Sequence, residues 1–217
     1  MTDLVSADAA AYAETNTTAF EGQLSDVVSW TREHTSSPGM LSGVAEARLL
    51  EALIVLSGAT RVLEVGTFTG FGTLAMAAAL GPGGRVTTLE VDEQMATVAR
   101  GHIDASPDRE KIELILGDAL QTLDRLEGRF DLVYIDAWKS DYPAYYEAVL
   151  PKLAPRGAIV ADNLFRGGRA LDPSAEEEST VGIRQFASQV QADARVHNVL
   201  LTVGDGLMLT WLRPDGE

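Results

Sequence analysis

The sequence predicts an α/β protein built on a doubly wound, mostly parallel sheet. Five short apolar runs alternate with helical stretches, at 61–65, 85–90, 112–116, 130–135 and 157–161. Such alternation is typical of parallel strands joined by crossover helices. A glycine-rich turn follows the first run directly, and doubly wound sheets bind ligands at the carboxyl ends of their strands. We therefore expect a ligand site at that end of the sheet.

The helical stretches of this pattern lie near 71–80, 92–104, 118–126, 142–150 and 176–193. The tail differs, because runs at 196–203 and 207–212 are joined through Gly204-Asp205-Gly206, which predicts an antiparallel hairpin. Before the first strand, residues from about 7 to 57 are expected to be helical, with Gly58 as the cap. We expect one domain, 1–217, with a helical cover or oligomer surface at 1–58 and the sheet at 59–217.

Composition and net charge limit the kinds of partner that we expect the protein to bind. The net charge is −15, from 32 acids against 17 Lys and Arg, which opposes binding to nucleic acid or to anionic lipid. No apolar run reaches the ~20 residues of a membrane helix, and the first residues lack signal-peptide features. The chain has no cysteine, which excludes disulfides and thiolate metal sites. We expect a cytoplasmic protein that binds a small molecule.

The glycine turn separates two cofactor classes. A dinucleotide site needs G-x-G-x-x-G, with bare backbone at the second glycine, but Phe68 stands there between Gly66 and Gly70. Glu64 adds an acid to an apolar strand end, which a purely structural strand rarely tolerates. The pattern E-x-G-x-x-x-G resembles motif I of the class I S-adenosylmethionine (SAM) methyltransferases, which implies their Rossmann-like fold.

Three further residues have both a binding and a structural interpretation. Glu90 ends the second strand, where an acid accepts ribose hydroxyls, or it is an exposed strand-end acid. Asp118 follows the third strand; the resemblance to these methyltransferases implies a contact with the adenine, and the alternative is a cap of the next helix. Ser42 lies in the break between the first helices and either lines a ligand site or is a helix N-cap. Asp92 is interpreted as a helix cap only.

The ends of the fourth and fifth strands carry the candidate chemistry. Asp136 ends one and Asp162-Asn163 the other, and adjacent strands open on the same crevice. Two carboxylates and an amide oxygen suit Mg²⁺; the alternative is that each acid caps a loop. Lys139, three residues after Asp136, is a candidate general base or a surface lysine. Trp138 is a flat wall for an aromatic ring or part of the core.

Together, V-L-E-V-G-T-F-T-G, Y-I-D-A-W-K, A-D-N and V-G-D-G resemble the cation-dependent O-methyltransferases, which include catechol and caffeoyl-CoA O-methyltransferases. The resemblance covers roughly 40–213. It implies Asp136, Asp162 and Asn163 as ligands of Mg²⁺ (or Mn²⁺ or Ca²⁺), with Lys139 and Asp136 as the catalytic pair. The positions that it implies for SAM binding are Ser42, Glu64, Gly66, Phe68, Gly72, Thr73, Glu90, Val91, Asp118, Ala119, Asp136 and Trp138.

Two departures concern substrate contacts. Catechol enzymes often have serine where this chain has Gly72, and Thr73 is a candidate replacement for its hydroxyl. The 164–175 segment, where the family usually completes its acceptor pocket, contains Arg166 and Arg169, which can hold an anionic substituent or be ordinary exposed arginines. No aromatic and basic cluster precedes Arg184, which favours a free catechol or a catechol-bearing natural product over a CoA thioester.

The sequence thus predicts a Mg²⁺-dependent SAM O-methyltransferase acting on vicinal hydroxyls of an aromatic small molecule, and the resemblance implies a homodimer. An NAD-dependent oxidoreductase is the alternative within enzymes, and Phe68 opposes it. A non-catalytic SAM-binding protein is the alternative from another class, and it would need neither Lys139 nor the metal set.

Overall fold

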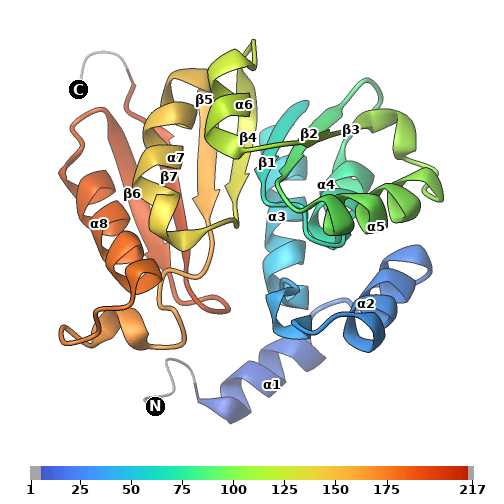
Figure 1. Ribbon diagram of the computed structural model, residues 1–217, viewed down its shortest axis with the longest axis horizontal. Helices are drawn as coiled ribbons and strands as arrows, with labels where there is room; N and C mark the ends of the chain where they lie inside the picture. Colours follow the sequence, from blue (N-terminus) through green and yellow to red (C-terminus); the bar gives the residue numbers. More distant parts are fainter. Residues whose placement is uncertain (1–5, 215–217) are drawn as a thin grey trace.

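The computed structural model describes residues 6–214 and contains a seven-stranded sheet with the order β3-β2-β1-β4-β5-β7-β6 (Figure 1). The first five strands are parallel and β7 is antiparallel to both of its neighbours. The predicted doubly wound sheet with a final hairpin is therefore confirmed. The strands are β1 Arg61–Val65, β2 Arg85–Glu90, β3 Ile112–Leu116, β4 Phe130–Ile135, β5 Leu153–Ala161, β6 Val196–Leu201 and β7 Leu207–Leu212.

Two strand boundaries differ from the prediction. β5 begins at Leu153 instead of residue 157, because Leu153 pairs with Phe130 before the register shifts and Ala158 pairs with Leu132. Pro155 and Gly157 are turn formers in the sequence, and they masked this extension. β6 ends at Leu201, two residues before the predicted end.

Helices cover both faces of the sheet. Leu63 and Val133 point into a core shared with α6, α7 and α8, whereas Val62 and Leu132 pack with α3 and α4 on the other face. This alternation follows from the two-residue period of a strand. The helices of the sheet region are α4 Phe71–Ala79, α5 Glu93–Asp104, α6 Ala119–Arg125, α7 Tyr142–Val149 and α8 Glu178–Ala192.

The N-terminal segment is helical, as predicted, with α1 Ala7–Thr15, α2 Gln23–His34 and α3 Val44–Ser57, which ends at the left-handed cap Gly58. α3 covers the sheet, because Leu50 and Ile54 pack in the same core as Val62. α2 packs beside α4, and the Thr31 hydroxyl lies 2.8 Å from that of Thr69 in the glycine turn. In Figure 1 both α1 and α2 lie at the lower edge of the molecule.

The predicted single domain spans 1–217, so residues 1–5 and 215–217 of that prediction lie outside the described residues. Within 6–214, the structure has no helix with the length and apolar character that a membrane crossing requires.

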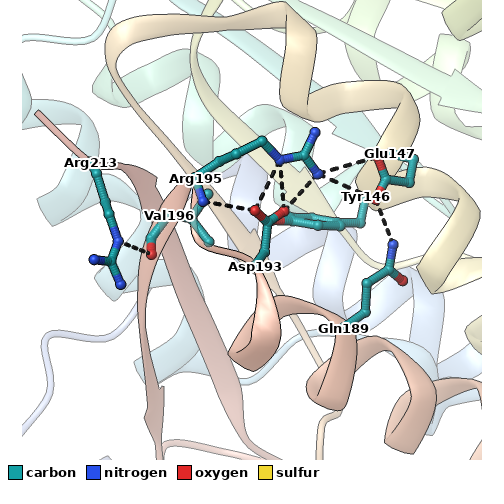
Figure 2. A network of polar contacts seen from close by, with 7 residues as sticks. All are labelled: Tyr146, Glu147, Gln189, Asp193, Arg195, Val196 and Arg213. Carbon is teal, nitrogen blue, oxygen red and sulfur yellow. Dashed lines mark hydrogen bonds and ion pairs between the residues drawn. The ribbon is translucent and has the colours of Figure 1, made fainter. Parts of the chain in front are cut away.

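A polar network joins α7, α8 and the start of β6 (Figure 2). Asp193 accepts hydrogen bonds from the Arg195 side chain at 2.6–3.0 Å and from the Tyr146 hydroxyl at 2.8 Å. Glu147 lies 3.4 Å from Arg195 and accepts a bond from Gln189 at 2.7 Å. Because β5 and β6 run in the same direction, this network lies at the amino edge of the sheet, away from the strand ends that carry the predicted chemistry.

Candidate active site

A cleft of about 1480 Å³ opens at the carboxyl ends of the parallel strands. Its walls come from the turns after β1 to β5 and from the segment between α2 and α3, including Met40 and Leu41. The predicted site residues that line it are Ser42, Glu64, Gly66, Phe68, Gly72, Glu90, Val91, Asp118, Ala119, Asp136, Trp138, Lys139, Asp162 and Asn163. Residues far apart in the sequence thus share one cavity, as the sheet topology predicts.

The glycine turn brings the ends of β1 and β4 together. Gly66 has φ +103°, and a Cβ at this position would collide with the backbone carbonyl of Asp136. Phe68 also has a left-handed backbone, with φ +52°, which is uncommon outside glycine. The turn is therefore shaped by close backbone approach on one side and by the Glu90 carboxylate on the other.

Glu90 holds the turns after β1 and β2 in place. One carboxylate oxygen accepts the amides of Thr67 and Phe68 at 3.2 and 2.7 Å, and the other accepts those of Val91 and Asp92 at 2.9 Å. Carboxylates that accept several backbone N–H groups are firmly oriented. The ribose contact stays a prediction, and the structure adds this positioning role, which the sequence did not reveal.

Glu64 is a buried acid behind the glycine turn. Its side chain is 1% exposed, and it accepts hydrogen bonds from Thr88 at 2.6 Å and from Thr73. Burial raises the pKa of Glu64 to about 8, because the charged form is poorly solvated there. Thr73, by contrast with the other predicted cofactor residues, does not line the cleft. Its hydroxyl donates to Glu64, and its contact with a cofactor stays a prediction.

The structure shows which of Asp92, Asp118 and Ser42 cap a helix. Asp92 caps α5 by accepting from Gln94 and Met95, as predicted. Asp118 caps α6 by accepting from the Gln121 amide at 2.8 Å, and it also lines the cleft, so its adenine contact stays a prediction. The N-cap of α3 is Gly43, not Ser42. The Ser42 hydroxyl lies instead 3.3 Å from the Tyr134 hydroxyl.

The turns after β4 and β5, with Asp136, Lys139, Asp162 and Asn163, form one half of the cleft, here called the chemical half. Lys139 and Asp136 form an ion pair in this half. Lys139 Nζ lies 2.5 Å from Asp136 Oδ1, and the two side chains are 16% and 17% exposed. Lys139 lies in the 3₁₀ turn Lys139–Asp141, directly before α7. Trp138, one residue earlier, is 69% exposed at the cleft, so the alternative of a core tryptophan is wrong.

Asp162 is the buried acid of this half. It is 2% exposed and accepts the Tyr134 hydroxyl at 2.9 Å and the Asn163 amide at 2.5 Å. Burial, together with repulsion from Asp136 and Glu46, raises the pKa of Asp162 well above its ordinary value. Asn163 has a left-handed backbone, with φ +60°. Strained backbone of this kind is often found at functional sites.

The donor set fits a divalent cation through its chemistry. Hard carboxylate and amide oxygens come from Asp136, Asp162 and Asn163, all on the cleft wall, and the mutual repulsion of the two acids is what a cation would relieve. Within residues 6–214, however, no group of three or more His, Cys, Asp or Glu side chains has a metal-binding arrangement. The set therefore depends on two acids and one amide.

The sequence analysis did not single out two residues that line the cleft, Glu46 and Tyr134. Glu46 is 7% exposed, and its carboxylate accepts the amides of Gly43 and Asp205, which ties α3 to the β6–β7 hairpin. Its only signal was an acid in the first turn of an apolar helix, which also fits an ordinary cap. Tyr134 looks like a core residue of β4, yet its hydroxyl reaches Asp162. A phenol buried beside a predicted strand-end acid was the available signal.

Comparison with known proteins agrees with this architecture. The catechol O-methyltransferase of Mycobacterium tuberculosis is 39% identical over 170 residues, covering 74% of this chain and 77% of that protein. Catechol O-methyltransferase domain-containing protein 1 of Mus musculus is 37% identical over 76% of this chain, which spans 65% of that protein's length. The crystal structure of the O-methyltransferase from Bacillus cereus in complex with SAH has a TM-score of 0.87 and 29% identity, covering 95% of this chain and 97% of that one.

A family model described as O-methyltransferase matches residues 14–212, nearly the whole described chain. The family predicted from the four strand-end motifs is therefore confirmed, and the chain belongs to the O-methyltransferase family.

Proposed function

We propose that this O-methyltransferase transfers the methyl group of SAM to one hydroxyl of a catechol-like aromatic small molecule, with Mg²⁺ or another divalent cation bound and with Lys139 as the general base. The SAH-bound Bacillus cereus structure and the catechol O-methyltransferase of Mycobacterium tuberculosis support the donor and the acceptor class. The observation that carries the proposal is the Lys139–Asp136 pair, 2.5 Å apart, in the same cleft as Asp162 and the glycine turn.

The half of the cleft beside the glycine turn and Glu90, here called the cofactor half, suits an adenosyl group. The turn at Gly66 leaves the backbone bare, and Glu90 fixes the turn that would face the ribose. Trp138 offers an exposed flat surface to an aromatic ring at the cleft. Holding donor and acceptor side by side supplies much of the rate in a reaction of this kind.

The chemical half supplies the proton acceptor. Lys139 Nζ would take the proton of the attacking hydroxyl, and Asp136 orients the amine through their ion pair. Asp136, Asp162 and Asn163 would hold the cation, and Tyr134 keeps the Asp162 carboxylate in place. When bound, a divalent cation chelates neighbouring acceptor oxygens and lowers the pKa of a hydroxyl.

The direct test is an assay with catechol, SAM and Mg²⁺, read by product mass, with and without EDTA. We expect methylated product that EDTA abolishes and that excess Mg²⁺ restores. Product formation that EDTA leaves unchanged would contradict the cation. Binding titrations with SAM and with NAD test the oxidoreductase alternative, and tighter binding of NAD would overturn the proposal.

The general base is tested by Lys139→Ala. We expect kcat to fall by about 10²–10⁴-fold, the usual contribution of a positioned general base. The dissociation constant for SAM should stay within about threefold, because Lys139 belongs to the chemical half of the cleft. A variant with undiminished kcat at neutral pH would remove Lys139 from the mechanism.

A further inference from the structure

Arg166 is a cationic side chain of the cleft that forms no ion pair with another described residue. It lines the cleft, and its one recorded side-chain hydrogen bond goes from Nη2 to the Ser179 hydroxyl at 2.9 Å. Its Nε is shielded from solvent and has no partner. Among residues 6–214 no carboxylate forms an ion pair with Arg166.

The other cations nearby are satisfied by the chain. Arg169, on the same segment, pairs with Glu177, and Lys139 pairs with Asp136. Arg184 donates to the backbone carbonyls of Asp172 and Ala175. A guanidinium carries five N–H donors, and leaving a buried donor unpaired is costly. The structure therefore separates the two arginines that the sequence left equivalent.

The backbone of Arg166 is held in an unusual conformation. Its φ is +49°, in the left-handed region that few non-glycine residues adopt. Asp205 fixes the turn, because its carbonyl accepts the Phe165 amide at 2.8 Å and its side chain accepts the Gly167 amide at 2.7 Å. Surrounding contacts thus hold a strained residue against the cleft, three positions after Asn163, a pattern that is common where a side chain is aimed at a ligand.

The charges around Arg166 indicate which kind of ligand it would bind. A planar guanidinium fork matches a carboxylate or a phosphate. The surrounding wall carries the acids Glu46, Asp136, Asp162 and Asp205, which repel anions elsewhere in this half. One arginine among these acids balances a single negative charge better than the double charge of a phosphate monoester, so the carboxylate is favoured.

We infer that the acceptor is an aromatic diol that carries a carboxylate, and that Arg166 binds this carboxylate. The inference rests on the proposed function, because it assigns the acceptor to the chemical half of the cleft. Arg166 thereby determines specificity among diols and takes no part in proton transfer.

The test compares four acceptors with one SAM donor. Catechol is neutral, 3,4-dihydroxybenzoate and 3,4-dihydroxycinnamate carry a carboxylate at two distances from the ring, and 2-(3,4-dihydroxyphenyl)ethylamine is cationic. For the native enzyme we expect kcat/KM to be at least about tenfold higher for one of the carboxylates than for catechol, and lowest for the amine. A native enzyme that prefers catechol or the amine overturns the inference.

Two variants locate the effect. Arg166→Gln should lower the ratio of kcat/KM for the preferred carboxylate to that for catechol by about 10–100-fold, mainly through KM, as expected when ground-state binding is lost. Arg166→Lys keeps the charge without the fork, so its loss should be smaller. Arg169→Gln is the matched control and should leave the ratio unchanged, because Arg169 already pairs with Glu177.

Calorimetry with SAM present gives a readout that does not depend on turnover. The affinity for the preferred carboxylate should fall by the same factor in Arg166→Gln as KM rises. An equal loss of activity on all four acceptors would assign Arg166 a structural role and overturn the inference. If none of the four diols is methylated by the native enzyme, the proposed function itself fails; if catechol is methylated but the ratio ignores Arg166, only the inference fails.

Discussion

Two acid clusters at opposite edges of the sheet show how differently one protein can treat the same side chain. In the cleft, Asp162 is buried near Asp136 and Glu46, and its pKa is raised by burial and by their charge. At the other edge, Asp193 accepts hydrogen bonds from Arg195, which hold its pKa well below the ordinary value (Figure 2). The residue type is the same, and the neighbouring charges set the opposite directions.

The two clusters differ in whether their charges are paired within the folded chain. Asp193 finds its cation and hydrogen-bond donors within the chain, so its network is complete as folded and stabilises the end of α8. The cleft combines the acids Glu46, Asp136, Asp162 and Asp205 with Lys139 and with Arg166, which no carboxylate of residues 6–214 pairs. Clusters that remain unbalanced in the folded chain are candidates for binding ligands, whereas balanced networks are usually structural.

The largest expected effect follows from breaking the cleft cluster. Asp162→Asn should lower kcat/KM with Mg²⁺ by at least about 100-fold, which corresponds to ~2.7 kcal/mol of transition-state stabilisation. In metal-free buffer its melting temperature should stay close to that of the native protein, because the removal of a repelling charge offsets the loss of one of the two hydrogen bonds that Asp162 accepts from Tyr134 and from the Asn163 backbone. Undiminished activation by Mg²⁺ would refute Asp162 as a ligand.

An intermediate effect is expected at Gly182, since α8 runs between the two clusters. A Cβ on Gly182 would lie 2.5 Å from the Lys139 carbonyl oxygen and 2.6 Å from Ser140 Cα, so Gly182→Ala must displace the turn that carries Lys139. We expect kcat to fall by about tenfold with SAM affinity retained, and stability to fall by about 1–3 kcal/mol from overpacking.

Gly101→Ala is the matched control for this prediction. Gly101 lies in α5, and a Cβ there would meet no atom within 4 Å. Replacing a helical glycine with alanine should stabilise the fold by about 0.5–1 kcal/mol. Its kinetics should match those of the native enzyme, and a Gly182→Ala enzyme with native kcat would show that the turn does not depend on close packing of α8.

The smallest effect belongs to the balanced network. Asp193→Asn should lower the unfolding free energy by about 1 kcal/mol at pH 7, because the Arg195 side chain is 55% exposed and water screens the pair. Since the pKa of Asp193 is lowered by folding, its contribution is present above the unfolded pKa of about 3.9 and is lost as pH falls through the folded value.

Urea unfolding between pH 7 and pH 3 measures this contribution. The stability curves of the native and Asp193→Asn proteins should converge as pH falls below about 4. The kcat of the variant should equal the native value, because the network lies away from the cleft. A stability difference that does not shrink between pH 4 and pH 3 would show that packing, not charge, holds Asp193.

Much of the fold could be predicted from local pattern. Strands such as 61–65 and 130–135 are buried apolar runs that end at Gly66 and at Asp136, so both their limits and the polar groups at their ends are visible in the sequence. The first half of β5 was missed, because Pro155 and Gly157 indicate a turn, whereas in the fold Leu153 already pairs with Phe130 of β4. Propensity yields to sheet context at such places.

The site was predictable where it depends on strand ends and not where it depends on side-chain partners. The Lys139–Asp136 pair follows from a three-residue spacing at a strand end. Nothing in the sequence shows that the Thr73 hydroxyl is buried against Glu64, which only the fold reveals. Arg166 and Arg169 look alike in sequence, and only the fold shows which of them Glu177 neutralises.

The close approach of Gly66 to the Asp136 carbonyl has a consequence for how this enzyme can vary. A side chain at position 66 would push apart the glycine turn, which we propose to face the methyl donor, and the segment that carries Lys139, the proposed proton acceptor. Donor binding and turnover should therefore fail together in any such variant. If Arg166 binds the acceptor as proposed, changes in the segment after Asn163 should alter acceptor preference while donor binding and proton transfer are retained.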